Sequence, residues 1–565
     1  MNNGKITAVP LAVAAAVLLA AGLRFINLGN LPLSESEAGW ALQAFEAARG
    51  GKVLWGGQPG YLALTAANFF LFGATEFWAR FWSALAGTLL VASPLLFKKY
   101  IGSAAALVLA FGLALEPVLV AAARQADGRM LAIAGLVFAL GFWLQGNLPW
   151  AGISLGLMLL GGPTAWLALA AMALAAMAAR VKLHAPQGEA GYHWRELGLW
   201  TGGTLLVAGT LGGIFPTGLS AWANSLVAFF EGWTQSMSVS AWLMLVAWLG
   251  VGPLAVVFGL GGVAAGWRER QRVDEFLSWA WAFLFVLFLI YPARQTADLA
   301  WSAVPLLGLA ARQVARLRLP EENRIPLAGY AILSGILMVT ATLNVSGLSI
   351  NMLPDEETMR LRGILGVGFL VLASFFLITW GWSLRLARYG LMLGVSGALL
   401  AYTLSSAAAA GGLGTRPENE IWIEGKSAAE QATATKVIGD VAEWVSGRRD
   451  TLAMTVSGVD SSLMRWALRG QIGAEVKALT ADATPQAVLT LESKDMKLGL
   501  ATAYTGQGLD WSRQVRWQAL EPEEWIHWLL FREVPSRTGV LDKQSVILWV
   551  RSDLFPGVAK SSAGR

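Results

Sequence analysis

The sequence predicts a mainly α-helical protein that crosses a membrane many times and ends in a smaller α/β domain. Three observations support this fold class. Only 14% of the 565 residues are charged, whereas a soluble chain carries about a quarter. The mean hydropathy is high, at +0.54. Apolar runs of roughly 20 residues, long enough to cross a hydrocarbon core of about 30 Å, recur between residues 7 and 411.

About thirteen transmembrane helices are predicted from these runs. They lie near residues 7–26, 78–97, 101–120, 129–145, 149–163, 164–180, 198–215, 239–264, 275–291, 299–311, 325–345, 363–381 and 390–411. Segment 149–180 also fits one long bent hairpin, and 299–311 is short. The first span resembles a signal peptide without a convincing cleavage site, so we expect it to be retained.

The distribution of basic residues predicts the orientation. Lysines and arginines gather in alternate loops, from Lys98 and Lys99 to Arg385 and Arg388, as the positive-inside rule requires of cytoplasmic loops. We therefore expect a multi-pass protein of the plasma membrane with a cytoplasmic amino terminus and an extracytoplasmic carboxyl-terminal domain. This clustering also accounts for the net charge of +5, so no nucleic-acid partner is expected.

The composition excludes several kinds of site. The chain has no cysteine, which excludes disulfides, thiol nucleophiles and cysteine-based zinc sites. Its three histidines, His184, His193 and His527, are too scattered to suggest a histidine-rich metal site.

Two domains are predicted, with a boundary at the linker "GGLGTRPENE". Residues 1–411 form the membrane domain, and residues 412–565 have a soluble composition. The tail alternates helix-like stretches, such as 426–446 and "EPEEWIHWLLF", with strand-like ones, such as "QAVLTLE" and "SVILWV". This alternation predicts a small α/β layer with a mostly parallel sheet. The tail contains neither a GxGxxG fingerprint nor a P-loop, so no nucleotide is expected.

Two outer loops are long enough to carry function. The first outer loop, 27–77, contains a predicted helix at 35–49, a glycine-rich turn and an apolar segment at 61–73. The second, 216–238, contains "SAWANSLVAFFEGW", which is typical of an amphipathic helix at the membrane interface.

Acidic residues open the helix of the first outer loop. Ser34 and Glu37 have the spacing of a capping box, so these acids could serve only to start the helix. Helical geometry favours a further role for Glu37, because Glu37 lies on the same face as Ala41 and Ala44, whereas Glu35 falls about 160° away. A carboxylate on the buried face is costly unless it binds a cation, a partner or a substrate hydroxyl. Glu37 is therefore the leading catalytic candidate, with Glu35 as a second.

A second acid occurs at a similar depth in "AAARQADGRML". Asp127 lies there between Arg124 and Arg129, which is the pattern of a short salt-bridged loop. In the functional interpretation, Asp127 and Glu37 converge from two outer loops. Together they would hold a divalent cation, Mg or Mn, or position an acceptor hydroxyl, while Arg124 or Arg129 neutralises a lipid phosphate.

Arg294 stands at the outer end of the ninth predicted span, in "YPARQTADLAW". It either anchors the helix to lipid headgroups or binds the phosphate of a lipid-linked substrate.

The segment "GQPGYLALTAANFFLFGATEFWARFWSALAGTLLVASPLLFKKYIG" resembles the region after the first outer loop of polyprenol-dependent GT-C glycosyltransferases. "LALEPVLVAAARQADGRML" is similar to their connection between the third and fourth spans. The resemblance covers residues 1–145 well and the rest by topology, and is strongest to the protein O-mannosyltransferase and aminoarabinose-transferase branch. The tail resembles that of a flippase-associated subgroup, which adds membrane-protein partners to the expectations.

The resemblance implies a GT-C-like membrane glycosyltransferase. Such an enzyme takes a sugar from a polyprenyl-phosphate carrier on the extracytoplasmic face and transfers it to a hydroxyl of a protein, lipid or glycan acceptor. It adds Gln58 and Trp40 to the substrate-binding candidates, beside Arg124, Arg129 and Arg294.

The sequence departs from the family pattern at the presumed base. The family opens the first-loop helix with an Asp-Glu pair, and "SEAGWA" puts Ser36 at the Asp position and Glu37 at the Glu position. The family's Pro-Pro turn is replaced by Gln58-Pro59-Gly60. Two hypotheses follow: Glu35 or Glu37 supplies the base for inverting transfer, or the chain is a catalytically degenerate binding or scaffold subunit of a membrane complex. A transporter is less favoured, because the spans show no inverted repeat and few ionisable residues at mid-membrane depth.

Overall fold

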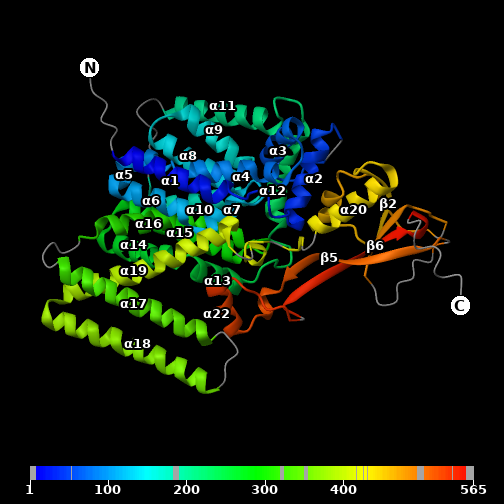
Figure 1. Cartoon of the computed structure of the whole chain (residues 1–565). Helices are drawn as coiled ribbons and strands as arrows, with labels where there is room; N and C mark the ends of the chain where they lie inside the picture. The colour runs from blue at the N-terminus through cyan, green and yellow to red at the C-terminus, as the bar shows by residue number, and fades with distance from the viewer. Residues whose placement is uncertain are drawn as a thin grey trace.

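The protein is a helical body joined to a small sheet domain (Figure 1). This computed structural model describes residues 8–51, 54–181, 190–318, 324–348, 354–414, 417–423, 425–428, 431–480, 482–492, 500, 502–537 and 539–554. His184, one of the three scattered histidines, lies outside these ranges. The helices of the first half are α1 (Ala8–Phe25), α2 (Glu35–Ala48), α3 (Pro59–Phe72), α4 (Glu76–Leu90), α5 (Pro94–Ile101), α6 (Ser103–Leu115), α7 (Pro117–Ala123), α8 (Arg129–Leu144), α9 (Leu148–Leu159) and α10 (Thr164–Ala178).

The second half of the body continues with longer helices. They are α11 (Ala190–Gly209), α12 (Thr217–Glu231), α13 (Ala241–Val251), α14 (Pro253–Glu269), α15 (Arg272–Ile290), a short 3₁₀ turn η1 (Thr296–Asp298), α16 (Leu299–Arg316), α17 (Arg324–Leu348), α18 (Pro354–Gly381) and α19 (Leu384–Ala408). Each of the thirteen predicted spans overlaps a helix or a helix pair, and the predicted helices at 35–49 and within 216–238 are α2 and α12.

Fewer helices meet the length and hydropathy that a membrane crossing needs. Among the described residues, five do so alone: Glu76–Ile101, Arg272–Ile290, Arg324–Leu348, Asp355–Gly381 and Leu384–Leu413. The number rises to seven if each of two bent helix pairs counts as one span. Several predicted spans are short helices instead, and 149–180 is a pair of them, α9 and α10.

Both bent pairs break at a proline. The α6–α7 pair bends by 56° at Glu116-Pro117, and the α13–α14 pair bends by 95° at Gly252-Pro253. Proline removes a backbone N–H and clashes with the preceding turn, so a helix ends before it and a new one starts. Carbonyls at both breaks accept hydrogen bonds from side chains, those of Leu113 and Ala114 from Arg24 and that of Gly250 from Tyr402.

Buried arginines bind carbonyls that helix ends leave unpaired. Arg24 donates to the carbonyls of Leu113 and Ala114 at 2.9 and 3.1 Å, at the end of α6. Arg124 donates to four carbonyls of the segment 23–27, at 2.8–3.2 Å, where α1 ends. Both arginines thus supply donors to helix carboxyl termini, where a cation also complements the helix dipole.

The helices α17 and α18 lie at the edge of the body (Figure 1). Only 6% of the most apolar window of α18 is buried inside the protein. Its exposed side chains include Leu365, Phe369, Phe376 and Trp380. A helix of this length, apolar on nearly all sides, is suited to lipid rather than water.

The sheet domain has six strands in the order β1-β5-β6-β4-β2-β3. Their bounds are β1 (Ser427–Ala428), β2 (Thr451–Ser457), β3 (Ile472–Val476), β4 (Ala487–Leu491), β5 (Tyr504–Val515) and β6 (Leu541–Arg551), with helices α20 (Gln431–Ser446), α21 (Ser462–Ala467) and α22 (Pro522–Phe531). The predicted mostly parallel sheet is wrong. Only β2 pairs in parallel, with β3 and β4, and the other pairs are antiparallel. The sequence analysis missed the long strand β5, because its Gly506 and Gly508 weaken the strand pattern.

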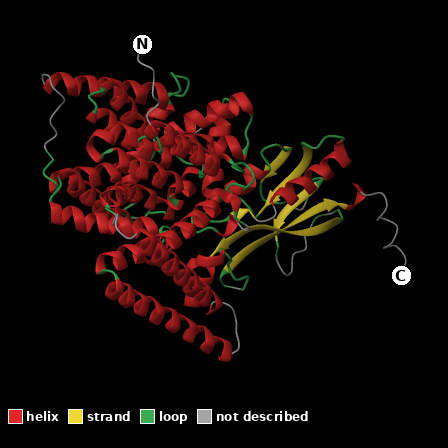
Figure 2. Cartoon of the chain, turned by 60° about the vertical axis from the view of Figure 1, so that its left-hand side comes forward, coloured by secondary structure: helices red, strands yellow, loops and turns green. Residues whose placement is uncertain are grey.

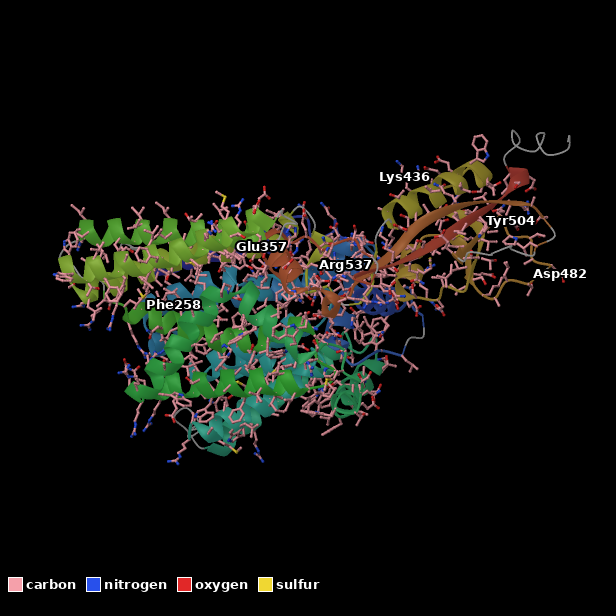
Figure 3. The ribbon with its side chains drawn as sticks, turned by 90° about the horizontal axis from the view of Figure 1, so that it is seen from below. Phe258, Glu357, Lys436, Asp482, Tyr504 and Arg537 are labelled. Carbon is pink, nitrogen blue, oxygen red and sulfur yellow. The ribbon has the colours of Figure 1, made fainter. Side chains whose placement is uncertain are left out.

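The sheet domain docks on the body at two places. Figure 2 shows the strands gathered beside the helices, and Figure 3 shows Phe258 of α14 in the body with Tyr504 and Asp482 at the far end of the domain. At the first place, Trp466 of α21 is fully buried against Phe45 and Phe69, and its indole N–H donates to Glu76 at 2.9 Å.

The second docking place is the amphipathic helix α22. Trp528 is fully buried in the same core as the body helices, and its indole N–H donates to the carbonyl of Asn419 at 2.8 Å. Tyr402 of α19 donates to the carbonyls of Gly250 and Leu529, which joins α22 to the break after α13. The two parts of the chain therefore share a hydrophobic core.

The docking of α21 generates a stability prediction. Trp466→Ala removes a buried ring and leaves Glu76 without its indole donor, so the free energy of unfolding should fall by about 3–5 kcal/mol. Denaturant titration of the purified protein in mixed micelles measures the change. Trp444→Ala is the matched control, because Trp444 is 67% exposed. Equal effects of the two substitutions would contradict the docking role of Trp466.

Candidate functional site

The helix α2 starts with the predicted capping box. The Ser34 hydroxyl accepts from the backbone N–H of Glu37 at 3.4 Å, and the Glu37 carboxylate accepts from the Ser34 N–H at 2.8 Å. The buried face of α2 comprises Glu37, Ala38, Ala41, Ala44 and Ala47. The sequence prediction that Glu37 faces the body is confirmed.

Glu37 forms a buried ion pair with Arg80 of α4. Its Oε1 accepts from Arg80 Nε at 2.8 Å and from the Ala126 N–H at 2.9 Å. Its Oε2 accepts from Arg80 Nη2 at 2.9 Å and from the Ser34 N–H. All four acceptor positions of the carboxylate are therefore occupied. Burial would raise the pKa of Glu37, but Arg80 and the two backbone donors outweigh it and hold the pKa below its usual value.

Arg80 also fixes the path of the first outer loop. Its Nη1 donates to the carbonyls of Leu28 and Leu31 at 3.2 and 2.6 Å, and its Nη2 donates to that of Pro32 at 3.0 Å. A single guanidinium thus links α4 to the segment that leads into α2.

Glu35 points to the sheet domain rather than into the body. Its two carboxylate oxygens accept from the backbone N–H groups of Ser462 and Leu463, at 2.6 and 3.3 Å, at the start of α21. The Ser36 hydroxyl lies 3.2 Å from that of Ser34. Each residue of the "SESE" motif therefore has a local or docking contact.

Asp127 lies in the tight turn between α7 and α8, next to Ala126. Ser83 of α4 donates to the Asp127 carbonyl at 2.5 Å, and the Arg129 N–H donates to its Oδ1 at 3.0 Å. Gln58 Oε1 accepts from the Gly128 N–H at 2.7 Å, so the structure brings Gln58 to this turn. Because Ala126 donates to Glu37, the Glu37 and Asp127 sites are adjacent, as the sequence analysis expected.

The carboxylate of Asp127 is only partly engaged. Its Oδ2 lies 3.4 Å from Arg129 Nη2 and accepts no hydrogen bond from a described residue. Burial raises the pKa of Asp127, and the nearby negative charges of Asp298 and Glu37 act in the same direction, against the opposing effect of Arg129. Asp127 is therefore a better proton acceptor than an ordinary aspartate.

Arg129 connects Asp127 to the loop that precedes α16. Its Nε lies 2.9 Å from Asp298 Oδ1, its Nη1 donates to Gln125 at 2.8 Å and its Nη2 donates to Gln295. Asp298 is fully buried, and burial raises its pKa. Two acids thus share one arginine, so this group retains unbalanced negative charge unless a proton or cationic group joins it.

Arg294 lies next to Gln295 in the same loop and is 1% exposed. Its Nη1 donates to the Tyr291 carbonyl at 3.1 Å, its Nη2 lies 3.7 Å from Met237 Sδ, and its Nε has no hydrogen-bond partner. Within the described part of the chain, no carboxylate lies within ion-pair distance of Arg294. A buried guanidinium without a counter-charge is costly, so its position suits an anionic ligand.

The remaining predicted residues have structural contacts. Arg124 binds the carbonyls at the end of α1, as described above. The Trp40 ring lies against Gly56, where it packs the turn between α2 and α3. The second outer loop also reaches the site, because Ser238 at its end donates to the Arg294 carbonyl at 2.6 Å.

The predicted pairing of Glu37 and Asp127 around a metal ion does not fit this geometry, because Glu37 has no free acceptor position. Among the residues that the structure describes, no group of three or more His, Cys, Asp or Glu residues is close enough to hold a metal ion. The reaction proposed below therefore uses no metal ion.

Sequence reasoning missed Arg80, Gln125, Gln295 and Asp298. Asp298 carries the same signal that identified Asp127, an acid at the outer end of an apolar run beside an arginine. Arg80 stands in the first turns of a long apolar helix, which is where a buried partner for an outer-loop acid is expected.

Solved structures with a similar arrangement exist. ArnT from Cupriavidus metallidurans in the apo state aligns over 97% of this chain and 98% of its own, with 18% identity and a TM-score of 0.53. The same protein bound to undecaprenyl phosphate aligns over 98% and 99%, with 17% identity and a TM-score of 0.52. The chain therefore shares the fold of these ArnT structures. This confirms the fold that the sequence resemblance implied.

A third solved structure is more distant. The oligosaccharyltransferase of Archaeoglobus fulgidus, tethered to an acceptor peptide, covers 83% of this chain and 64% of its own, with 13% identity and a TM-score of 0.48. No protein-family model matches the sequence, and a comparison with curated proteins gives no match.

The Glu37–Arg80 pair generates a pH-dependent prediction. Glu37→Gln leaves Arg80 buried without its counter-charge, so the free energy of unfolding at neutral pH should fall by about 3–5 kcal/mol. The folded-state pKa of Glu37 lies below its usual value of 4.5. The stability from this pair is therefore complete above the unfolded-state pKa and is lost as the pH falls through the folded-state pKa.

Denaturant titrations at several pH values test this. The difference between wild type and Glu37→Gln should shrink in acid, and Glu46→Gln on the exposed face of α2 should have little effect at any pH. A difference that stays constant down to low pH would refute the assignment.

Proposed function

We propose that this protein is a membrane glycosyltransferase that moves a sugar from a polyprenyl-phosphate carrier to an acceptor hydroxyl on the extracytoplasmic face. Two observations carry the proposal. Among the described residues, Arg294 is a buried cation without an acidic partner, and Asp127 is a buried acid with an unengaged oxygen. Arg129 links their two loops, because it contacts both Asp127 and Gln295, the residue after Arg294. The cluster lies in a fold shared with ArnT, one structure of which contains undecaprenyl phosphate.

Arg294 binds the phosphate of the lipid-linked donor in this proposal. Its three guanidinium nitrogens have only a carbonyl and a thioether as partners, so hydrogen bonds remain available for phosphate oxygens. During transfer the bond between the anomeric carbon and the phosphate oxygen breaks. The leaving polyprenyl phosphate gains negative charge, which the guanidinium stabilises.

Asp127 acts as the base in this proposal. Its Oδ2 accepts the proton of the acceptor hydroxyl while the hydroxyl oxygen forms the new bond to the anomeric carbon. The raised pKa of Asp127 favours this role, because a more basic carboxylate takes up a proton more readily. The sequence hypothesis gave the role to Glu37, but the saturated Glu37 carboxylate suits a positioning role, which holds the Ala126 N–H and hence the Asp127 turn.

The base assignment is testable by turnover. Asp127→Asn should lower kcat about 10²–10⁴-fold, because general-base catalysis contributes that much, with little change in the KM for the donor. The assay follows sugar transfer from undecaprenyl-phosphate-linked arabinose, mannose or glucose in liposomes. Asp482→Asn is the control, because Asp482 is an exposed acid at the far end of the sheet domain (Figure 3). Unchanged turnover in Asp127→Asn would exclude this base.

The phosphate-binding assignment is testable by affinity. Arg294→Gln should weaken the binding of undecaprenyl phosphate about 10–100-fold, because a hydrogen bond to a charged group contributes about 1.5–3 kcal/mol. Native mass spectrometry of the full-length protein with this lipid measures the loss. Arg537→Gln is the control, since the Arg537 side chain is 45% exposed on the sheet domain. Binding without turnover in the wild-type protein would favour the degenerate scaffold instead.

A further inference from the structure

A cavity lies where the two bent helix pairs meet. It is lined by Glu116 at the break of α6–α7, by Gly252 at the break of α13–α14, and by residues of α16 and of the linker to the sheet domain. The glycine at position 252 allows this approach, because a Cβ there would collide with Glu116 Oε1. The carboxylate of Glu116 therefore lies directly against the second break.

Glu116 is the only ionisable residue among those that line this cavity. It is 7% exposed, and its carboxylate has no hydrogen bond or ion pair with any residue that the structure describes. Most of the lining is aliphatic, including Val118, Val251 and Leu299. An acid with no partner in such surroundings is costly, which indicates a ligand rather than a role in packing.

Two further polar groups of the lining lack partners. The indole N–H groups of Trp248 and Trp422 are both buried without a hydrogen-bond acceptor. Their nitrogen atoms are covered by other protein atoms, so among the described lining residues the carboxylate of Glu116 is the polar group available to a ligand. The cavity volume of about 20 Å³ suits one hydroxyl group or water molecule.

This combination selects the chemistry of the ligand. A metal or ammonium cation needs several acceptors, whereas the described lining offers one carboxylate, and an anion is repelled by an ionised Glu116. A hydroxyl group donates a hydrogen bond to a carboxylate and adds no charge.

Two wall residues of the cavity are linked to the candidate active site by the chain and by hydrogen bonds. Leu299 directly follows Asp298, which pairs with Arg129. The carbonyl of Trp422 accepts from Gln125, which in turn accepts from Arg129. The linker segment that closes the cavity is therefore attached to the charged cluster around Asp127.

We propose that the Glu116 cavity binds a hydroxyl or hydroxymethyl group of the sugar during transfer. This proposal rests on the proposed function, since it assigns the cavity to the sugar of the lipid-linked donor. Glu116 is then a specificity residue that selects an uncharged polyhydroxyl head group. Arg294 holds the phosphate of the same molecule.

The test measures binding without turnover. Thermal unfolding of the full-length protein in detergent is followed in concentration series of free mannose, glucose and arabinose, with glycerol and sodium chloride in parallel. At saturation at least one monosaccharide should raise the Tm of the wild type by about 2–4 °C. Glu116→Leu should abolish the shift, and Glu116→Gln should retain most of it, because the amide still hydrogen-bonds a hydroxyl.

A matched glycine pair separates occlusion of the cavity from general destabilisation. Gly252→Ala puts a methyl group against Glu116 and should abolish the monosaccharide shift. Gly261→Ala in α14 should preserve it, because a Cβ there would meet only a Gln313 side-chain carbon at 3.7 Å.

Several outcomes would overturn the proposal. They are no monosaccharide shift in the wild type, an undiminished shift in Glu116→Leu, and a shift with sodium chloride or with glycerol alone. The binding of undecaprenyl phosphate, measured in parallel, separates this proposal from the proposed function. Arg294→Gln should lose the binding of undecaprenyl phosphate and keep the monosaccharide shift. If the wild type shows the monosaccharide shift but neither binds this lipid nor transfers sugar, only the proposed function is contradicted.

Discussion

The buried ion pair between Glu37 and Arg80 is the interaction on which the site depends. One carboxylate accepts four hydrogen bonds from three segments: two from Arg80 of α4, one from the Ser34 N–H before α2 and one from the Ala126 N–H before α8. Removal of either charge leaves the other without compensation in a water-poor interior. The pair therefore fixes the first outer loop and the turn that carries Asp127, so the geometry of the reacting groups follows from a contact outside them.

Arginines of the outer half fall into two classes by what they contact. Arg24 and Arg124 bind backbone carbonyls at helix ends, and Arg80 and Arg129 bind acids, so each has the contacts of a structural group. Arg294 has neither an acid nor a set of carbonyls. The same comparison applies to acids, since Glu35 and Glu37 are fully engaged whereas Asp127 and Glu116 keep unengaged oxygens. The proposed function uses this difference, since it assigns ligand binding to Arg294 and Asp127.

The sequence predicts the local features well because they follow from periodicity. The helix at 35–49, its capping box and the buried face with Glu37 all depend on residues within one segment. The partner of Glu37 depends on a contact 43 positions away, which no local pattern encodes. For the same reason the antiparallel β5–β6 pair was missed, as was the role of Glu35, whose contact is 427 positions distant. Glu116 precedes a proline inside an apolar run. Its position beside a cavity depends on where the two helix breaks meet in the folded chain, which the sequence does not show.

The shared core between the body and the sheet domain has a practical consequence. Trp517, Trp525 and Trp528 pack on one another, and Trp517 and Trp528 belong to the hydrophobic cluster of the body. A fragment produced without the membrane helices would present this aromatic surface to water and would self-associate. The carboxyl-terminal region is thus an integral part of one folding unit, and biochemical work requires the intact polypeptide.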